Sequence, residues 1–465
     1  MVKYGCSILR CLCGCFIIRQ RIVVSTLCLL GIVITYAQRV VLSISITKIV
    51  PLEKRLFINE CLAEDEEASE EMGPTADWSE SVQQYVLLSF FAGYLVGHIP
   101  AGLISDKIGP RIVFFWGVFV STLSTVVTPV TIVYTHAAVV IVIRTIAGLA
   151  QAVLYPCTSI LIARYIPPQE RGVMGAFSMA APSLGMLFGN LVTGQLTYMY
   201  KDWQWAFYCF SLLGVIWCIF CCIYIYNGAE SNPRMLEDEV EYINSRIAPG
   251  LRLKIPWKGM LTDPAVIGLM FGSLGSDLWI YLMVTNIPKY MGTILHMNMN
   301  ELSLATSIPS LFLWISSVIS GEIVDWTITK KNTNLLWNRR ISSFIGVFIP
   351  LIFTAAMGFA GCDKVLTVIL YSLSNFSRGP FYCSLKINHL DLTSNHAGII
   401  MAIINGFGCF SGIFAPLIVK YLASDNTLKS WANVFFTVCA INLGCHIIYM
   451  VLARVERAKW DTEDE

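Results

Sequence analysis

Apolar segments long enough to cross a lipid bilayer recur along the whole chain. The hydrocarbon core of a bilayer is about 30 Å thick, so a spanning helix needs roughly 20 predominantly apolar residues. The sequence contains such segments near residues 22–50, 82–104, 112–134, 137–163, 172–198, 206–226, 264–290, 301–321, 341–360, 364–385, 396–422 and 431–453. Because lipid offers no partner for backbone polar groups, each segment is predicted to be a helix. We therefore predict an all-α membrane protein with twelve transmembrane helices.

The composition argues against an ordinary soluble protein and against an enzyme. Of the 465 residues, 55% are hydrophobic and only 14% are charged. The longest polar segment, residues 227–262, is too short for a catalytic domain, and the sequence contains no nucleotide-binding loop and no metal-ligand spacing. We therefore expect a protein embedded in the lipid bilayer, with no enzyme activity, no cofactor and no nucleic-acid partner.

Charged residues are divided unequally between the two sides of the predicted membrane region. Acidic residues crowd the first long loop, residues 51–80. Basic residues collect on the other side, which holds Lys3, Arg10, Arg19, Arg21, Lys107, Arg111, Arg164, Arg171, Lys330, Lys331, Arg339, Arg340, Arg454, Arg457 and Lys459. The positive-inside rule then places both termini in the cytosol. The N-terminus 1–21, the linker 227–262 and the tail 456–465 are predicted to be cytosolic, with residues 461–465 in solvent.

The sixteen cysteines do not indicate a disulfide framework. Most of them fall inside predicted spans, and the acidic loop holds only Cys61. Four others, Cys6, Cys11, Cys13 and Cys15, lie among basic residues just before the first span. That setting permits S-palmitoylation, with ordinary thiols beside the membrane as the alternative.

A short motif occurs at the same place in each half of the chain. GLISDKIGPR, from Gly102 to Arg111, closes the second predicted helix with a tight turn, an acid and two bases. A weaker echo, GEIVDWTITKK from Gly321 to Lys331, closes the eighth. We therefore predict two six-helix pseudo-repeats, residues 22–226 and 263–455. Transporters built from such repeats bind their substrate between the halves, near the bilayer midplane.

GLISDKIGPR resembles the signature loop of the major facilitator superfamily. The whole chain resembles the anion and phosphate cotransporter branch of that superfamily, which includes sialin, the vesicular glutamate transporters and the sodium-phosphate cotransporters. The matching segments are YAQRVVLSISI (36–46), SFFAGYLVGHIPAGLISDKIG (89–109), RTIAGLAQAVLYP (144–156), IPPQERG (166–172) and NHLDL (388–392). The resemblance implies the major facilitator fold and transport by alternating access.

Three arginines, Arg39, Arg144 and Arg378, lie inside predicted spans. An arginine near the bilayer centre costs roughly 2.5–3.5 kcal/mol on insertion scales, so it is expected to be paired or to line an aqueous cavity. Asp277 is the only carboxylate well inside a predicted span. Three bases against one acid predict a positive cavity, which suits an anion. The alternative is that each arginine pairs with an acid or with carbonyl groups.

The resemblance refines these assignments. Arg39 and Arg144 match family arginines implicated in substrate handling, whereas related transporters usually carry a small residue at the position of Arg378. Gln151 stands where proton-coupled members carry a glutamate, and an amide cannot titrate. The helix-2 histidine of the family aligns with Leu87 and the helix-7 arginine of the glutamate transporters with Ser276, which disfavours vesicular glutamate transport.

Several other side chains are candidates for the transport path. Tyr36 and Tyr155 fall near the two outer arginines, where each can donate a hydrogen bond to an anion, with simple packing as the alternative. We include Gln151 among the substrate-binding candidates. Asp277 and His98 are the candidates for binding a coupling ion, Na⁺ or H⁺. For each, neutralising or hydrogen bonding to a neighbouring helix is the alternative.

The motif loops are predicted to form a gate on the cytosolic side. The candidates are Asp106, Lys107, Arg111, Asp325, His389 and Asp391. An acidic turn placed against neighbouring helix ends can hold one side closed while the halves rock. For His389 and Asp391 the alternative is a solvated loop that caps the next helix.

Together these features predict a secondary active transporter that acts as a monomer. We expect a cation-coupled symporter of inorganic phosphate or small organic anions, in the plasma membrane or in a vesicle or lysosome membrane. One alternative is an anion sensor or scaffold that has kept the fold without transport. The other is an uncoupled anion uniporter.

Overall fold

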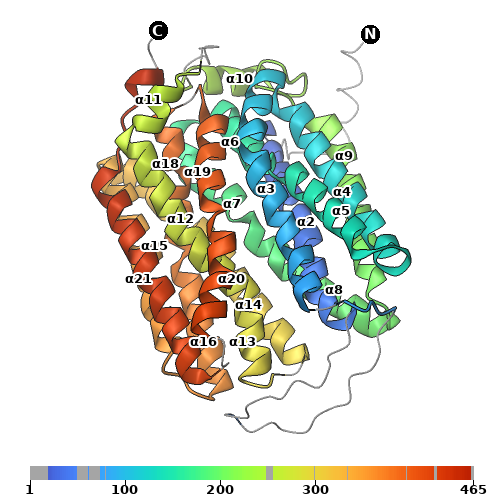
Figure 1. Cartoon of the computed structure of the whole chain (residues 1–465). Coiled ribbons are helices and arrows are strands. Elements are labelled where there is room, and N and C mark those ends of the chain that lie inside the picture. The colour runs from blue at the N-terminus through green and yellow to red at the C-terminus, as the bar shows by residue number, and fades with distance from the viewer. Residues whose placement is uncertain are drawn as a thin grey trace, which may run out of the picture.

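The computed structural model describes residues 19–49, 61, 74–78, 80–247, 255–297, 299–331, 333–393, 395–423 and 427–461. Long helices run side by side through this part of the chain (Figure 1). The first half contains α2 (Gln20–Ile49), α3 (Glu80–Ile108), α4 (Pro110–Tyr134), α5 (Ala137–Gln151), α6 (Leu154–Tyr165), η1 (Pro168–Glu170), α7 (Arg171–Met179), α8 (Ala181–Tyr200) and α9 (Gln204–Tyr224). The acylation hypothesis for the N-terminal cysteines and most of the acidic loop lie outside the described residues.

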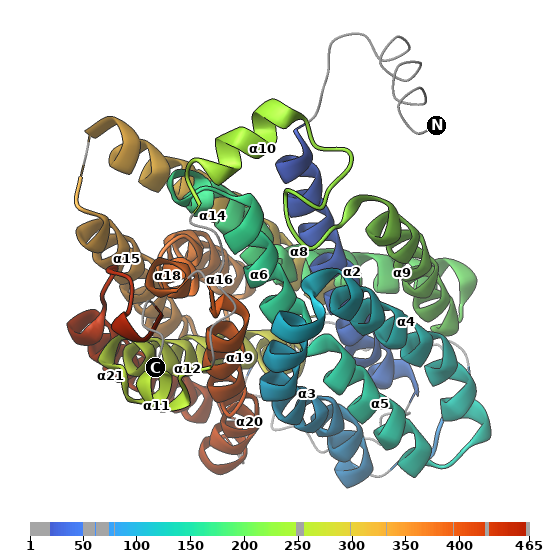
Figure 2. The same ribbon diagram turned by 90° about the horizontal axis from the view of Figure 1, so that it is seen from above.

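Two short helices, α10 (Glu237–Asn244) and α11 (Trp257–Thr262), lead into the second half. That half contains α12 (Pro264–Thr285), α13 (Ile287–Thr293), α14 (Met299–Lys331), α15 (Leu335–Met357), α16 (Lys364–Ser377), α17 (Gly379–Tyr382), α18 (Leu385–Leu392), α19 (Ala397–Gly408), α20 (Ser411–Leu422), α21 (Leu428–Leu452) and η2 (Lys459–Asp461). Seen from above, the helices before α10 and those after α11 form two neighbouring bundles (Figure 2). The predicted all-helical fold in two six-helix halves is confirmed.

Eleven helices in the described residues are long and apolar enough to span a membrane. The tenth of the twelve predicted segments is not in this set, and the structure divides it into α16, α17 and α18. The break follows Arg378, at Gly379 and Pro380. Proline cannot donate a backbone hydrogen bond, and its ring clashes with the preceding turn of a helix. A β-carbon on Gly379 would overlap the backbone of Ser316 on α14, so the glycine permits a close helix contact.

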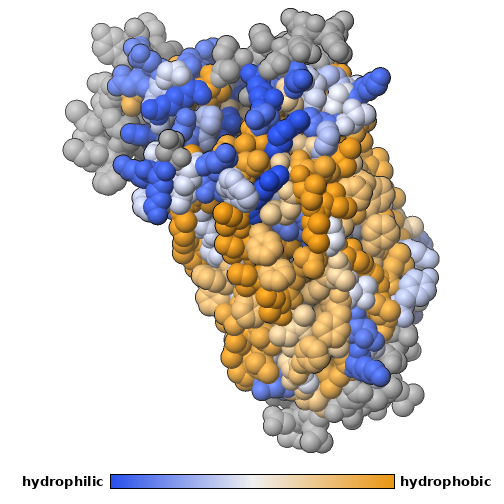
Figure 3. Space-filling view, turned by 90° about the vertical axis from the view of Figure 1, so that its left-hand side faces the viewer, coloured by the Kyte–Doolittle hydropathy of each residue, from blue (hydrophilic) through white to orange (hydrophobic). Residues whose placement is uncertain are grey.

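The outer surface has the polarity of a membrane protein. Figure 3 shows a broad hydrophobic band along the bundle, with hydrophilic residues gathered at one end. Many large apolar side chains are exposed on this surface, among them Val96 at 68%, Leu212 at 63% and Val365 at 68%. Soluble monomers rarely expose contiguous apolar surface on this scale, whereas lipid covers it at no cost.

Small residues bring the two halves into contact. Helix α3 of the first half packs on α19 of the second, and α8 packs on α14. A β-carbon on Gly102 of α3 would lie 2.8 Å from the β-carbon of Ala402. A β-carbon on Gly398 would lie 2.6 Å from Ile160. These glycines allow close packing between membrane helices, where small residues at the interface favour association.

The N-terminus of α2 and the segment after α21 lie at the same end of the bundle, which we call the α10 end (Figure 1). The Glu239 carboxylate on α10 accepts hydrogen bonds from the backbone amides of Gln20 (3.0 Å) and Arg21 (3.2 Å). It thereby satisfies two amides at the N-terminus of α2, where a negative charge also complements the helix dipole. The linker is thus attached to the first bundle.

The segment after α21 is packed against the second bundle. Asp461 is fully buried and accepts a 2.5 Å hydrogen bond from the hydroxyl of Thr393. Burial raises the pKa of the Asp461 carboxyl, but hydrogen bonds with His396, Thr393 and Arg457 outweigh this effect, so its pKa lies below its ordinary value. The prediction that residue 461 belongs to a solvated tail is therefore wrong.

A disulfide between Cys61 and Cys362 joins the two halves at the end opposite α10. This bond could not be predicted from the sequence, because Cys362 lies in a short turn and its partner is 301 residues away in the chain. The expectation of no disulfide is therefore wrong for this pair, while the ten other cysteines among the described residues are free thiols in this structure.

Replacing Cys362 with serine is expected to destabilise the protein. Cross-links that close long loops typically contribute about 2–4 kcal/mol by restricting the unfolded chain. Thermal unfolding in detergent should detect the loss, and Cys222→Ser, which removes an exposed free thiol, is the matched control. Alkylation of both Cys61 and Cys362 in the native, unreduced protein would contradict the bond.

Candidate functional site

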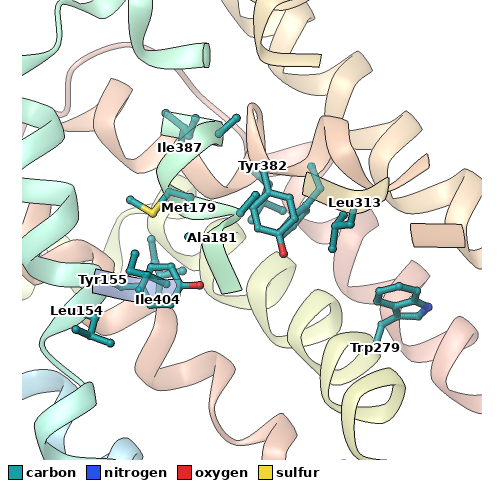
Figure 4. Close-up of a cluster of buried hydrophobic side chains, with 14 of the residues drawn as sticks. Leu154, Tyr155, Met179, Ala181, Trp279, Leu313, Tyr382, Ile387 and Ile404 are labelled. Atoms are coloured by element: carbon teal, nitrogen blue, oxygen red, sulfur yellow. The ribbon is translucent and has the colours of Figure 1, made fainter. Parts of the chain in front are cut away.

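A cavity of about 640 Å³ lies between the two halves. Its walls come from α2, α3, α5, α6 and α8 on one side and from α12, α13, α14, α16, α17, α18 and α19 on the other. It extends to Ser43, Tyr198, Thr285 and Ser303, which lie toward the end opposite α10. Figure 4 shows a cluster of buried hydrophobic side chains, of which Tyr155, Trp279, Leu313 and Tyr382 also line the cavity.

Arg39 projects from α2 into this cavity. Its guanidinium carbon lies 4.5–5.7 Å from the centroids of five aromatic rings, those of Tyr36, Phe90, Phe91, Tyr94 and Tyr281. The faces of such rings stabilise a cation, and the N–H groups of the guanidinium, which lie in its own plane, remain available as donors. The Nη1 group is buried and has no hydrogen-bond partner in the described structure.

Arg144 lies beside it, on α5. Its Nη2 group donates a long hydrogen bond of 3.5 Å to the backbone carbonyl of Arg39, and its guanidinium lies 5.1 Å from the ring of Phe90. The buried Nε group has no partner. In the part of the chain that the structure describes, neither arginine forms an ion pair. Two neighbouring guanidinium groups thus face the cavity with unsatisfied donors, and their role in binding a substrate stays a prediction.

Asp277 is the acidic residue that lines the described part of the cavity, as predicted. Its carboxylate lies 3.9 Å from the Nζ atom of Lys386, which also lines the cavity. Lys386 is not among the candidates from the sequence, because it lies just beyond the tenth predicted span, which ends at residue 385. Its Nζ group donates a 2.7 Å hydrogen bond to the side chain of Asn405 and lies 5.3 Å from the ring of Tyr155.

Arg378 does not line the cavity, although the sequence placed it on the same path. Its side chain is completely buried, 4.4 Å from the ring of Trp279 and 4.7 Å from that of Phe381. Its Nη2 group donates to the carbonyl of Ser276. Arg378 lies at the break between α16 and α17, and its side chain packs inside the second bundle. There its hydrogen bond to Ser276 joins this break to α12.

Gln151 and His98 are also outside the cavity lining. The amide of Gln151 donates to the carbonyl of Thr35 and to the hydroxyl of Ser121, and so ties α5 to α2 and α4. The ring of His98 is fully buried, with Nδ1 2.6 Å from the carbonyl of Tyr94. Gln151 therefore joins neighbouring helices, whereas the hydrogen bond of His98 stays within α3 and its Nε2 atom has no partner in the described structure, so neither reading of His98 is decided.

The α10 end of the cavity is closed by contacts between the halves. Asp325 on α14 accepts hydrogen bonds from the backbone amides of Gly172 (3.1 Å) and Val173 (2.8 Å) at the start of α7. Arg171 donates to the carbonyl of Leu390. His389 Nε2 lies 3.1 Å from the hydroxyl of Ser159. Asp325 and His389 thus occupy the predicted gate.

The other predicted gate residues contribute less directly. Asp391 is paired with Arg339 at 2.9 Å within the second bundle. Asp106 faces Gly398, whose β-carbon would lie 3.3 Å from its carboxylate. Arg111 donates to the carbonyl of Cys222 in the first bundle, and Lys107 is exposed. The turn before Arg111 requires Gly109, because its φ of 108° is unfavourable for residues with a side chain.

Comparison with known proteins identifies the family. A model of the Major Facilitator Superfamily matches residues 28–416. The chain belongs to this superfamily. Human sialin is 30% identical to it over 93% of this chain and 89% of sialin. Sodium-dependent phosphate transport protein 1 of Rattus norvegicus is 26% identical over 93% of each chain. Within the superfamily the chain thus belongs to the anion and phosphate cotransporter branch, as its motifs predicted.

The solved structures support the same superfamily fold. A proton:xylose symporter bound to 6-bromo-6-deoxy-D-glucose matches 95% of this chain and 98% of its own, with a TM-score of 0.68 and 13% sequence identity. This similarity concerns the fold. Because the superfamily relatives are transporters rather than enzymes, the prediction of a multi-pass membrane transporter is confirmed.

In a major facilitator protein the gate contacts determine which side is open, so Asp325→Asn is expected to favour opening at the α10 end. Hydrogen bonds to a charged group contribute about 1.5–3 kcal/mol, which corresponds to roughly a tenfold or larger shift in the equilibrium. We expect slower modification of Ser43→Cys by an impermeant thiol reagent added at the opposite end. Glu322→Gln, an exposed change on the same helix, is the control. Equal labelling rates in both variants would contradict the latch.

Proposed function

We propose that the protein is a cation-coupled symporter of inorganic phosphate or a small organic anion. One observation carries the proposal: Arg39 and Arg144 face a cavity between the halves with unsatisfied guanidinium donors and with no ion pair in the described structure. A guanidinium presents a planar fork of donors that fits a carboxylate or a phosphate. An anion with two such acceptors would satisfy both side chains.

The size and the walls of the cavity support a small substrate. A volume of about 640 Å³ lies in the range of roughly 300–1,000 Å³ that is usual for small-molecule sites. Aromatic rings around Arg39 exclude water and so strengthen its attraction for an anion. The relatives include a sodium-dependent phosphate transport protein, which agrees with an anionic substrate.

Alternating access follows from the arrangement of the two halves. The cavity reaches toward one end, while Asp325, Arg171 and His389 close the other. We propose that the α10 end is cytosolic, because it carries the basic loops. The Cys61–Cys362 disulfide then lies on the extracellular or lumenal side, where an oxidising environment preserves such bonds. Both halves of one chain line the described part of the cavity, which supports a monomeric transporter.

The proposal is tested by uptake into proteoliposomes that contain the purified protein. Labelled inorganic phosphate and a panel of small carboxylates would be offered with an inward Na⁺ gradient, with a pH gradient and with neither. Concentrative uptake with one gradient is the expected result and names the coupling ion. Uptake that only equilibrates the anion would identify a uniporter. Saturable binding without flux would identify a sensor, and either result would overturn the symporter.

A further inference from the structure

The ion pair between Asp277 and Lys386 lies on the wall of the substrate cavity, on the side opposite the two arginines. Asp277 comes from α12 and Lys386 from α18, and both line the cavity. Their side chains are 13% and 6% exposed. A pair in this position is accessible to a bound anion, although it is largely removed from bulk water.

The geometry of the pair is loose. The distance of 3.9 Å between Lys386 Nζ and Asp277 Oδ1 exceeds the about 2.7–2.9 Å of a charge-assisted hydrogen bond. The close bond of the ammonium group goes instead to Asn405, at 2.7 Å. An ammonium group has three donors, so this bond leaves capacity toward the cavity. Asn405 thus holds Lys386 in place while Asp277 serves as its counter-ion.

A glycine provides the space for the Asp277 carboxylate. A β-carbon on Gly408 of α19 would overlap Oδ2 of Asp277. The other charged or titratable groups around this carboxylate come from α2, α12, the α16 C-terminus, α17 and the end of α19, and they are Arg39, Tyr36, Tyr281, Arg378, Tyr382 and Cys409. Among these groups, the Asp277 carboxylate is surrounded by cations and by neutral hydrogen-bond donors.

We propose that Lys386 is a third cationic ligand of the transported anion and that Asp277 is its counter-ion only while the cavity is empty. When the anion binds Lys386, Asp277 loses its partner. A buried carboxylate without a partner is costly, so the coupling cation binds Asp277 together with the anion. In the empty protein the pair neutralises itself, which allows the halves to return without a cation. This inference rests on the proposed symport and assigns its coupling site.

Three variants test the assignment in the full-length protein: Lys386→Gln, Asp277→Asn and the double variant. The probes are labelled phosphate and the same carboxylate panel, and the readouts are the KM for the anion and the dependence of uptake on the cation gradient. Lys420→Gln, an exposed change on α20, is the control. Thermal stability in detergent separates folding defects from effects on transport.

We expect Lys386→Gln to raise the KM at least tenfold. Asp277→Asn is expected to keep or lower the KM, because the anion no longer competes with a carboxylate for Lys386. The same change should abolish stimulation of uptake by the cation gradient. The double variant should have the high KM of Lys386→Gln. Recovery of wild-type KM and of cation dependence in the double variant would identify a purely structural pair and overturn the proposal.

The failure of this inference can be distinguished from the failure of the proposed function. If the wild type takes up an anion with a gradient and Lys386→Gln keeps its KM, symport stands and the assignment of Lys386 is wrong. If Asp277→Asn keeps its cation dependence, the coupling assignment is wrong. If the folded wild type neither binds nor moves any anion of the panel, both proposals are overturned.

Discussion

Replacing Arg144 with alanine is expected to weaken anion uptake strongly. The change removes one of the two guanidinium groups that face the cavity, whereas its neighbours on α3 and α5 are retained. Loss of one partner from a buried, hydrogen-bonded charge pair typically costs about 2–5 kcal/mol. Since roughly 1.4 kcal/mol corresponds to a factor of ten, the affinity for the anion should fall at least about 30-fold. Initial uptake rates over a range of substrate concentrations would measure this loss.

Two further variants control this experiment. Arg144→Lys keeps the positive charge but loses the planar fork, so we expect a weakened and measurable uptake. Arg246→Ala removes an exposed arginine that contacts Tyr242 near the α10 end and should leave the KM unchanged. Wild-type affinity in Arg144→Ala would remove Arg144 from the substrate site.

Replacing Gly148 with leucine is expected to prevent stable folding. A β-carbon at this position would overlap the backbone carbonyl oxygen of Phe90 on α3, and one at Gly93 would overlap that of Thr145 on α5. The two glycines therefore set the closest approach of α3 and α5. Overpacking usually costs about 1–3 kcal/mol, and a clash with rigid backbone across a long helix contact belongs at or above the upper end. The amount of folded protein in size-exclusion profiles would report the effect.

Gly444→Leu is the matched control, because Gly444 is exposed on α21 and a β-carbon there meets no atom within 4 Å. It should fold like the wild type. A normal yield and thermal stability of Gly148→Leu would mean that α3 and α5 are separated further than the structure places them.

The candidate site was predictable only in part. Arg39, Arg144 and Asp277 stood out because a charge within an apolar span is costly, and all three line the cavity. Arg378 satisfied the same criterion and yet lies inside the second bundle. Apolar length and charge count give the depth of a residue in the membrane, but they do not give the face of the helix on which it lies.

Lys386 was missed for a related physical reason. The span 364–385 reads as one helix by hydropathy, and Pro380 alone does not determine whether it kinks or breaks. The contact of Gly379 with Ser316 on α14 accompanies a break, and α18 then carries Lys386 to the cavity. Likewise, the bond between Cys61 and Cys362 depends on two segments that are 301 residues apart.

The sequence by itself determined that the chain spans a membrane, that it has two similar halves and that its interior is positively charged. These properties follow from segment length, apolar content and the cost of burying charge, which are local or additive. Only the tertiary structure decided that Arg39 and Arg144 share one cavity, that Gln151 ties helices together and that Lys386 faces Asp277. These depend on helix rotation and breaks, which are set by packing between residues distant in the chain.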